Sequence, residues 1–189
     1  MPGANAKVRL SLAVTAVGLG LAACDASSTP GPSAPVGGSA SSLTVTSKSF
    51  PSDLQIPVEY TCDGKNVSPQ LTWSAPPDGT KALVVIADDL DASGGFTHWV
   101  ALDLPPDALS LPEGADIAAL GGRVGLNDQH NVQYDGPCPP RGSYHRYRFR
   151  VFASDRVLPL DEGATRSAVE GALAGHVLGV GSLVANFSH

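Results

Sequence analysis

The sequence lacks the motifs that mark several common enzyme classes. It has no Gly-x-Ser-x-Gly motif, which would carry a hydrolase nucleophile, and no Walker loop, which would bind nucleotide phosphates. Positive charge is also scarce, because 12 Lys and Arg residues stand against 18 Asp and Glu residues, for a formal net charge of −6. A surface of this charge repels nucleic-acid phosphates, so we expect no nucleic-acid partner.

A membrane-spanning run is lacking too, because the apolar stretch at residues 10–23 falls short of the ~20 residues that a bilayer requires. This stretch follows Lys7 and Arg9 and ends in Leu-Ala-Ala before Cys24, which is typical of a lipoprotein signal peptide at residues 1–23. We expect lipidation of Cys24, with acyl chains such as palmitate, and anchoring to the extracytoplasmic face of the cell membrane. The alternative is a plain secretory signal with an incidental cysteine.

Residues 24–42 are almost entirely Ala, Ser, Thr, Pro and Gly after the cysteine. Such a segment cannot bury enough apolar surface to offset the entropy of ordering it, so we predict a flexible tether. The remaining residues 43–189 have a length typical of one domain.

Helical signal is scarce in this domain. The best candidate is residues 165–174, with Thr165 or Ser167 as the N-cap and Gly175 at the end. Short apolar runs separated by Pro, Asp and Gly turns favour strands instead, at residues 43–47, 56–60, 71–74 and 177–187. The pattern predicts a mainly β domain with antiparallel strands and one or two short helices near the C-terminus.

Acidic residues follow a continuous apolar run. Residues 83–87 read as a strand covered on both faces, and they lead into Asp88, Asp89 and Asp91. After a Ser-Gly-Gly turn, residues 96–102 form a second expected strand that contains His98 near its start. If the two strands pair in antiparallel fashion, the carboxylates and His98 meet at one end of the sheet.

A proline-rich loop, residues 136–140, precedes a third strand. From residue 143 the side chains alternate, which places His145 and Tyr147 on the inward face and three arginines on the other. His145 and Tyr147 therefore suit the mouth of a small-ligand pocket, although they could equally be hydrogen-bonded core residues. We interpret Arg146, Arg148 and Arg150 as a solvated strand face in preference to a phosphate-binding patch.

These motifs occur in an order that resembles the phosphatidylethanolamine-binding protein family, in its bacterial Raf-kinase-inhibitor-like branch. The resemblance rests on short segments from across the domain: Tyr-Thr-Cys-Asp-Gly at 60–64, Asp-Asp-Leu-Asp-Ala at 88–92, His-Trp at 98–99, Gly-Leu-Asn-Asp at 125–128, Gly-Pro-Cys-Pro-Pro at 136–140, His-Arg-Tyr at 145–147 and Gly-His-Val-Leu at 175–178. It implies an antiparallel β-sandwich with a small anion pocket at one end and no catalytic activity common to the family.

The resemblance also assigns the pocket residues. They are Asp89, Asp91, His98, His145 and Tyr147, with Gly136 and Pro137 as a wall. Leu90 and Ser93 stand where relatives usually have prolines, which suggests a looser acidic turn, and Phe187 stands where some relatives place a pocket tyrosine. The resemblance implies no metal, and the two aspartates and two histidines lack the close spacing of a helical zinc motif. We expect no cofactor.

With Cys24 lipidated, Cys62 and Cys138 remain, an even number in an exported domain, and we predict that they form a disulfide. Cys138 as a nucleophile is the alternative, but the flanking prolines favour a structural role.

We expect this domain to bind a small anion or phosphorylated head group reversibly, and not to be an enzyme. Donors would be His98, His145 and backbone N–H groups near Gly136. The adjacent Asp89 is tolerable if the anion keeps a proton, if Asp89 takes one up, or if Asp89 holds a histidine protonated. Two alternatives remain: a module that inhibits or joins a partner protein in the cell envelope, and an enzyme acting on a phospho-compound.

Overall fold

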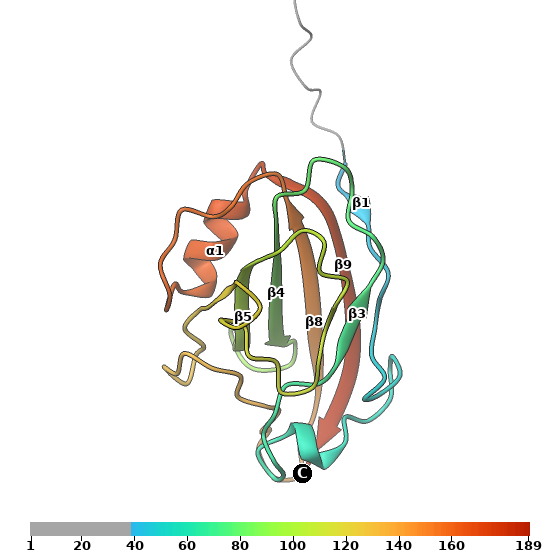
Figure 1. Ribbon diagram of the computed structural model, residues 1–189. Helices are drawn as coiled ribbons and strands as arrows, with labels where there is room; N and C mark the ends of the chain where they lie inside the picture. The colour runs from blue at the N-terminus through green and yellow to red at the C-terminus, as the bar shows by residue number, and fades with distance from the viewer. Residues whose placement is uncertain (1–38) are drawn as a thin grey trace, which may run out of the picture. The chain divides into compact units, whose positions relative to one another are not determined.

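The structure is a computed structural model that describes residues 39–189 (Figure 1). The predicted signal peptide, the lipidation site Cys24 and most of the predicted tether lie outside the described residues. Within residues 39–189, no helix has the length and apolar character needed to cross a membrane.

Strands dominate the fold, and they form two sheets. The elements in chain order are β1 (Ser41–Ser42), β2 (Val45–Thr46), the 3₁₀ helix η1 (Val58–Tyr60), β3 (Leu71–Trp73), β4 (Ala82–Asp89), β5 (Phe96–Leu104), β6 (Ser110–Leu111), β7 (Arg123–Val124), β8 (Tyr144–Ser154), α1 (Arg166–Leu173) and β9 (Val177–Ser188). The larger sheet has the order β1-β9-β8-β4-β5-β7, and the smaller sheet has the order β2-β3-β6. Only the β1–β9 pair is parallel in the described sheets. The prediction of a mainly β, antiparallel sandwich with a short C-terminal helix is confirmed.

The larger sheet has a core on each of its faces. One face packs against the smaller sheet through alternate residues of the central strands, among them Val85, Ala87, Phe149 and Val151. The opposite face, which carries Val84, Ile86, Val100 and Leu102, packs under Val169 and Leu173 of α1. All eight residues of β4 are consequently buried, which explains why its first six residues, 82–87, are continuously apolar and do not alternate.

Helix α1 begins and ends as its sequence indicates. The hydroxyl oxygen of Thr165 accepts a hydrogen bond from the backbone N–H of Ala168 at 3.3 Å, so Thr165 and not Ser167 is the N-cap. Gly175 follows the helix with φ +78°, a conformation that glycine adopts without strain. Figure 1 shows α1 beside the sheet, away from β3.

The structure differs in detail from the sequence-based assignments at the start of the domain. Ser41 and Ser42, which we assigned to the tether, pair with β9 of the larger sheet. The strand predicted at residues 43–47 is limited to Val45–Thr46. The strand predicted at residues 56–60 is a 3₁₀ turn, because Pro57 sets φ to −60° and its carbonyl accepts the N–H of Tyr60 at 3.0 Å.

Candidate functional site

The registers of β4, β5 and β8 bring the predicted polar residues together at one end of the larger sheet. Asp89, the last residue of β4, lies opposite Phe96 of β5 and opposite Tyr147 of β8. His98 is therefore two residues along β5 from this point, and His145 is two residues along β8. The antiparallel pairing of β4 with β5 is confirmed.

A cavity of about 410 Å³ opens at this end of the sheet. Four predicted residues line it, namely Asp89, Asp91, His98 and His145. The remaining lining comes from the acidic turn, the start of β5, a neighbouring loop and the proline loop: Ala92, Ser93, Phe96, Gln129, Cys138, Pro139 and Pro140. The turn residue Ser93 thus borders the cavity, whereas Leu90 borders a different one on the α1 side.

Gly136 and Pro137, which we predicted as the wall, do not line this cavity; Cys138, Pro139 and Pro140 form the wall instead. Gly136 lies deeper, where a Cβ atom would come within 2.2 Å of the carbonyl oxygen of Tyr60. Its N–H donates to Oδ1 of Asn66 at 2.7 Å and is not free to bind an anion. Glycine is required at this position by close packing.

Tyr147 packs against both histidines and does not line the cavity. Its ring packs edge-on against His98 at 5.3 Å and is stacked with His145 at 6.4 Å, measured between ring centroids. The hydroxyl is buried and has no hydrogen-bond partner among the described residues. Burial raises the pKa of Tyr147, so the phenol keeps its proton. Phe187, at the position where some relatives place a pocket tyrosine, is buried beside His189.

Asp89 orients His145. Its Oδ2 accepts a hydrogen bond from Nδ1 of His145 at 2.6 Å. Its Oδ1 accepts from the backbone N–H groups of Asp91 at 2.8 Å and Ala92 at 3.1 Å. Both carboxylate oxygens are thus in use, and a protonated His145 would form an ion pair with Asp89.

His98 has the opposite character. Its Nδ1 donates to the backbone carbonyl of Asp135 at 2.7 Å, and its side chain is buried. Burial lowers the pKa of His98, so the ring is neutral at neutral pH. With Nδ1 protonated, Nε2 carries a lone pair, and it makes no hydrogen bond within residues 39–189. His98 therefore offers the cavity an acceptor and not the donor that we predicted.

An amide cluster that sequence analysis missed surrounds Asp135, whose backbone carbonyl binds His98. The carboxylate of Asp135 accepts hydrogen bonds from the side-chain amides of Asn127 at 2.7 Å, Asn131 at 2.8 Å and Gln133 at 2.8 Å. Burial opposes ionisation of Asp135, but these bonds outweigh it and hold the pKa of the carboxyl below its usual value. The only sequence signal was the concentration of amide residues between positions 127 and 133.

The three arginines of β8 each have an acidic partner. Arg146 makes two side-chain hydrogen bonds to Asp91, at 2.7 and 2.9 Å, and they hold the pKa of Asp91 at about 2. Arg148 bonds Asp88 at 2.6 Å, and Arg150 bonds Glu170 of α1 at 3.0 Å. The face is therefore a paired charge network partly covered by α1, and our interpretation of it as simply solvated was wrong for Arg148 and Arg150.

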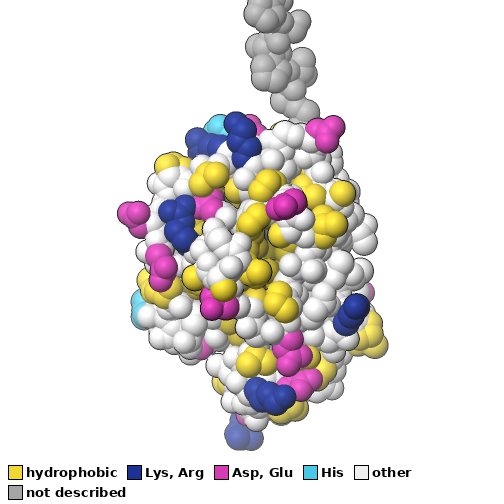
Figure 2. All heavy atoms as spheres, viewed as in Figure 1, with side chains coloured by type: hydrophobic (Ala, Val, Ile, Leu, Met, Phe, Trp, Pro, Cys, Tyr) yellow, Lys and Arg dark blue, Asp and Glu magenta, His cyan; other side chains and the backbone are white. Residues whose placement is uncertain are grey.

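Charge elsewhere is dispersed. On the face shown in Figure 2, Lys and Arg side chains form small separate groups among acidic, apolar and uncharged side chains. This view of the described domain therefore contains no broad basic surface.

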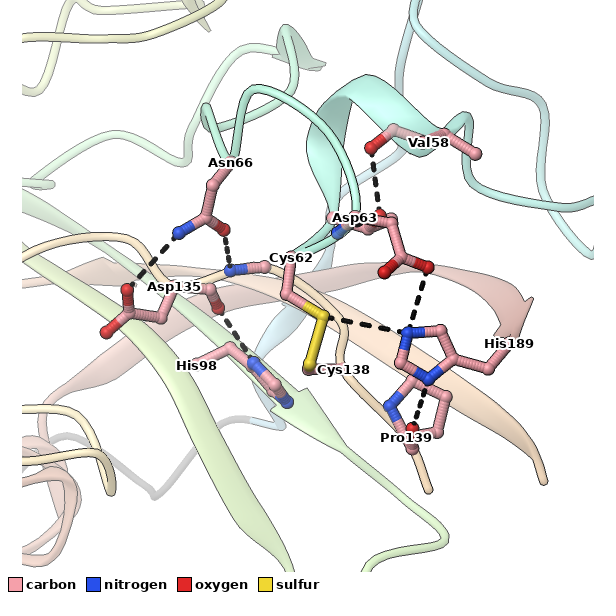
Figure 3. The surroundings of a disulfide bond; sticks show 11 residues. Val58, Cys62, Asp63, Asn66, His98, Asp135, Cys138, Pro139 and His189 are labelled. Atoms are coloured by element: carbon pink, nitrogen blue, oxygen red, sulfur yellow. Dashed lines mark hydrogen bonds and ion pairs between the residues drawn. A yellow bond between two sulfur atoms is a disulfide. The ribbon is translucent and has the colours of Figure 1, made fainter. Parts of the chain in front are cut away.

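A disulfide joins Cys62 to Cys138, as we predicted, with 5.5 Å between the two Cα atoms (Figure 3). It ties the loop after η1 to the proline loop that forms one wall of the cavity. In this state Cys138 has no free thiol to act as a nucleophile.

The fold and the site together define a class of protein: a β-sandwich with an aspartate and two histidines in a pocket at one end of the larger sheet. Residues 46–188 match the family described as phosphatidylethanolamine-binding protein, and the chain belongs to that family.

Solved structures and sequence relatives agree with this assignment. YbcL of Escherichia coli, described as a new member of the mammalian PEBP family, has a TM-score of 0.73 and 30% identity, covering 78% of this chain and 98% of that one. CT736 of Chlamydia trachomatis, described as a homologue of the same family, also has a TM-score of 0.73, with 33% identity, covering 79% and 99%. A UPF0098 protein of Methanothermobacter thermautotrophicus is 46% identical over 69% of this chain and 88% of its own length. LppC of Mycobacterium tuberculosis, which is named as a lipoprotein, is 38% identical over 77% and 72%.

Proposed function

We propose that this protein is a membrane-anchored lipoprotein whose end pocket reversibly binds a small anion that carries a proton, such as a phosphomonoester monoanion. The observation that carries the proposal is the pair of unlike histidines in one cavity. His145 is backed by the carboxylate of Asp89, whereas His98 is neutral with its Nε2 unprotonated. The pocket therefore combines a donor and an acceptor.

This pair complements a phosphate group that keeps one proton. A protonated His145 would donate from Nε2 to a phosphate oxygen, while the P–OH group would donate to Nε2 of His98. The proton on the ligand also limits the repulsion between the anion and Asp89, which is one of the arrangements that make an acid tolerable beside an anion. Reversible binding, and not turnover, is the activity that we propose for the pocket.

Membrane attachment of the proposed binding protein would come from a lipid on Cys24. The support is the lipobox-like sequence before this cysteine, together with the name of the mycobacterial relative. A lipid anchor would restrict the pocket to ligands of the cell envelope.

The test is calorimetric titration of glycerol phosphate into the purified full chain and into His98→Ala and His145→Ala variants. Each variant should bind roughly tenfold to hundredfold more weakly, since a hydrogen bond to a charged group contributes about 1.5–3 kcal/mol. His176→Ala is the matched control, because His176 also bonds an aspartate, Asp155, but lies outside the pocket.

Two further arms of this titration separate the possible ligands. A phosphodiester such as glycerophosphoethanolamine has no P–OH group and should bind more weakly than glycerol phosphate. Affinity for glycerol phosphate should fall as pH rises above about 6, where a phosphomonoester loses its second proton. Equal affinity of all four proteins, or steady consumption of the ligand, would contradict the proposal.

A further inference from the structure

A second cluster of ligand-type side chains surrounds the disulfide, outside the anion pocket. His189 lies beside it, with Nε2 at 3.9 Å from Sγ of Cys62 and 2.9 Å from Oδ2 of Asp63 (Figure 3). The sulfur atoms of Cys62 and Cys138 and a ring nitrogen of His189 all lie within 4.8 Å of one another. Two cysteines and a histidine thus converge from three separate segments, and the carboxylate of Asp63 contacts the histidine.

We propose that reduction of the Cys62–Cys138 disulfide converts this cluster into a Zn²⁺ site. The ligands are the thiolates of Cys62 and Cys138, Nε2 of His189 and a carboxylate oxygen of Asp63. These are the ligand types and the number that a tetrahedral structural zinc site uses.

The two distances from Nε2 of His189, to Cys62 and to Asp63, are close to those of such a site once reduction lets the sulfur atoms separate. Zn–S bonds of about 2.3 Å and Zn–N bonds of about 2.0 Å at tetrahedral angles place a sulfur and a nitrogen roughly 3.5 Å apart. The Cys62 Sγ to His189 Nε2 distance of 3.9 Å is close to that value already. The Asp63 and His189 atoms need to separate by about 0.5 Å from their present contact of 2.9 Å to admit the ion.

The histidine is oriented as a zinc ligand would be. Its Nδ1 donates to the backbone carbonyl of Pro139 at 2.8 Å, which directs Nε2 toward the sulfur atoms. Metal-binding histidines commonly use the second ring nitrogen in this way. The side chain of His189 is only 11% exposed, so its position does not depend on the disulfide alone.

The two cysteines should also stay together once the S–S bond is broken. The N–H of Cys62 donates to the carbonyl of Pro137 at 3.1 Å. On either side of this bond, the N–H of Gly136 donates to Asn66, and the hydroxyl of Tyr134 donates to the carbonyl of Tyr60. These hydrogen bonds do not involve sulfur and keep the two loops adjacent.

The chemistry has two balanced steps. In the first, a dithiol reductant transfers two electrons and two protons to the disulfide, which yields the thiols of Cys62 and Cys138 and the disulfide of the reductant. In the second, Zn²⁺ binds as both thiol protons and the Nε2 proton of His189 leave to solvent. The ion then replaces the S–S bond as the crosslink between the two loops, and reoxidation by an electron acceptor of the disulfide class releases it.

The experiment compares metal binding by the reduced and oxidised full chain. The protein is reduced with dithiothreitol, freed of reductant without oxygen, and titrated first with Co²⁺ and then with Zn²⁺. The reduced chain should bind one Co²⁺ with the absorption of a tetrahedral thiolate complex, and Zn²⁺ should displace it. The oxidised chain should show no such absorption.

Variants test which residues hold the ion. His189→Ala and Asp63→Asn should each weaken Zn²⁺ binding by the reduced chain at least about tenfold, since even residues that only support a metal ligand cost that much. His176→Ala removes a comparable histidine–aspartate pair and should leave the affinity unchanged. The proposal is overturned if reduced and oxidised chains bind Zn²⁺ alike, or if His189→Ala binds it as tightly as the parent.

Discussion

Removal of the disulfide should destabilise the domain by a large and calculable amount. The perturbation is the double substitution Cys62→Ala with Cys138→Ala. The bond spans a sequence separation of 76, and the chain-entropy relation for a loop of that length gives about 4.5 kcal/mol at 25 °C. Both cysteines are exposed, so few packing contacts are lost and the crosslink itself should account for most of the change.

The assay is urea unfolding of the parent and the double variant, followed by circular dichroism in the presence of a metal chelator. We expect the variant to lose about 4 kcal/mol, to unfold roughly 10–15 °C lower on heating, and to show a larger dependence on urea because its unfolded chain is more expanded. The parent under reducing conditions should reproduce the variant. A loss of less than about 1 kcal/mol with an unchanged urea dependence would show that the crosslink does not restrict the unfolded chain as reasoned.

Three further predictions concern other parts of the chain. Replacing Cys24 with Ser should abolish partition of the expressed protein into the detergent phase, because no lipid can be attached. Burial lowers the pKa of His98, so the unfolded chain binds a proton on this ring more readily than the folded chain does. The contribution of His98 to the free energy of unfolding should therefore have its full value above about pH 6.5 and decrease below it. His98→Gln should flatten this decrease, measured as urea midpoints against pH. Gly181→Ala should destabilise strongly, because its Cβ would lie 2.1 Å from the carbonyl oxygen of Leu43, whereas Gly171→Ala in α1 meets nothing and should raise stability by about 0.5–1 kcal/mol in thermal unfolding.

Local patterns in the sequence predicted much of the fold. The alternation from Tyr144 onward and the apolar run of β4 specify which faces are buried, because a strand repeats every two residues. The pattern misled at residues 56–60, where alternating apolar residues resembled a strand. There Pro57 provides no N–H for a sheet and instead starts a 3₁₀ turn, an effect that periodicity does not report.

The candidate site was only partly accessible to the same reasoning. Strand ends that meet in an antiparallel sheet predicted the convergence of Asp89, His98 and His145. The protonation of His98 was not predictable, because it depends on the carbonyl of Asp135, which is 37 residues away in sequence. His189 escaped notice for a similar reason, since its contacts with Cys62 and Pro139 arise only when β9 pairs with β8 and brings the end of the chain to the proline loop.

The short pairing of β1 with β9 has a consequence for orientation. Ser41 lies opposite Gly179, near the start of β9, while His145 lies opposite Phe187, near its end. Eight residues of strand separate these positions, or about 26 Å, so the chain enters the domain at the far end from the pocket, as the placement of β1 and the C-terminus in Figure 1 shows. Whatever precedes residue 39 is therefore joined to the domain at the end opposite the pocket, so an attachment made through the N-terminal segment leaves the mouth of the pocket uncovered by the point of entry.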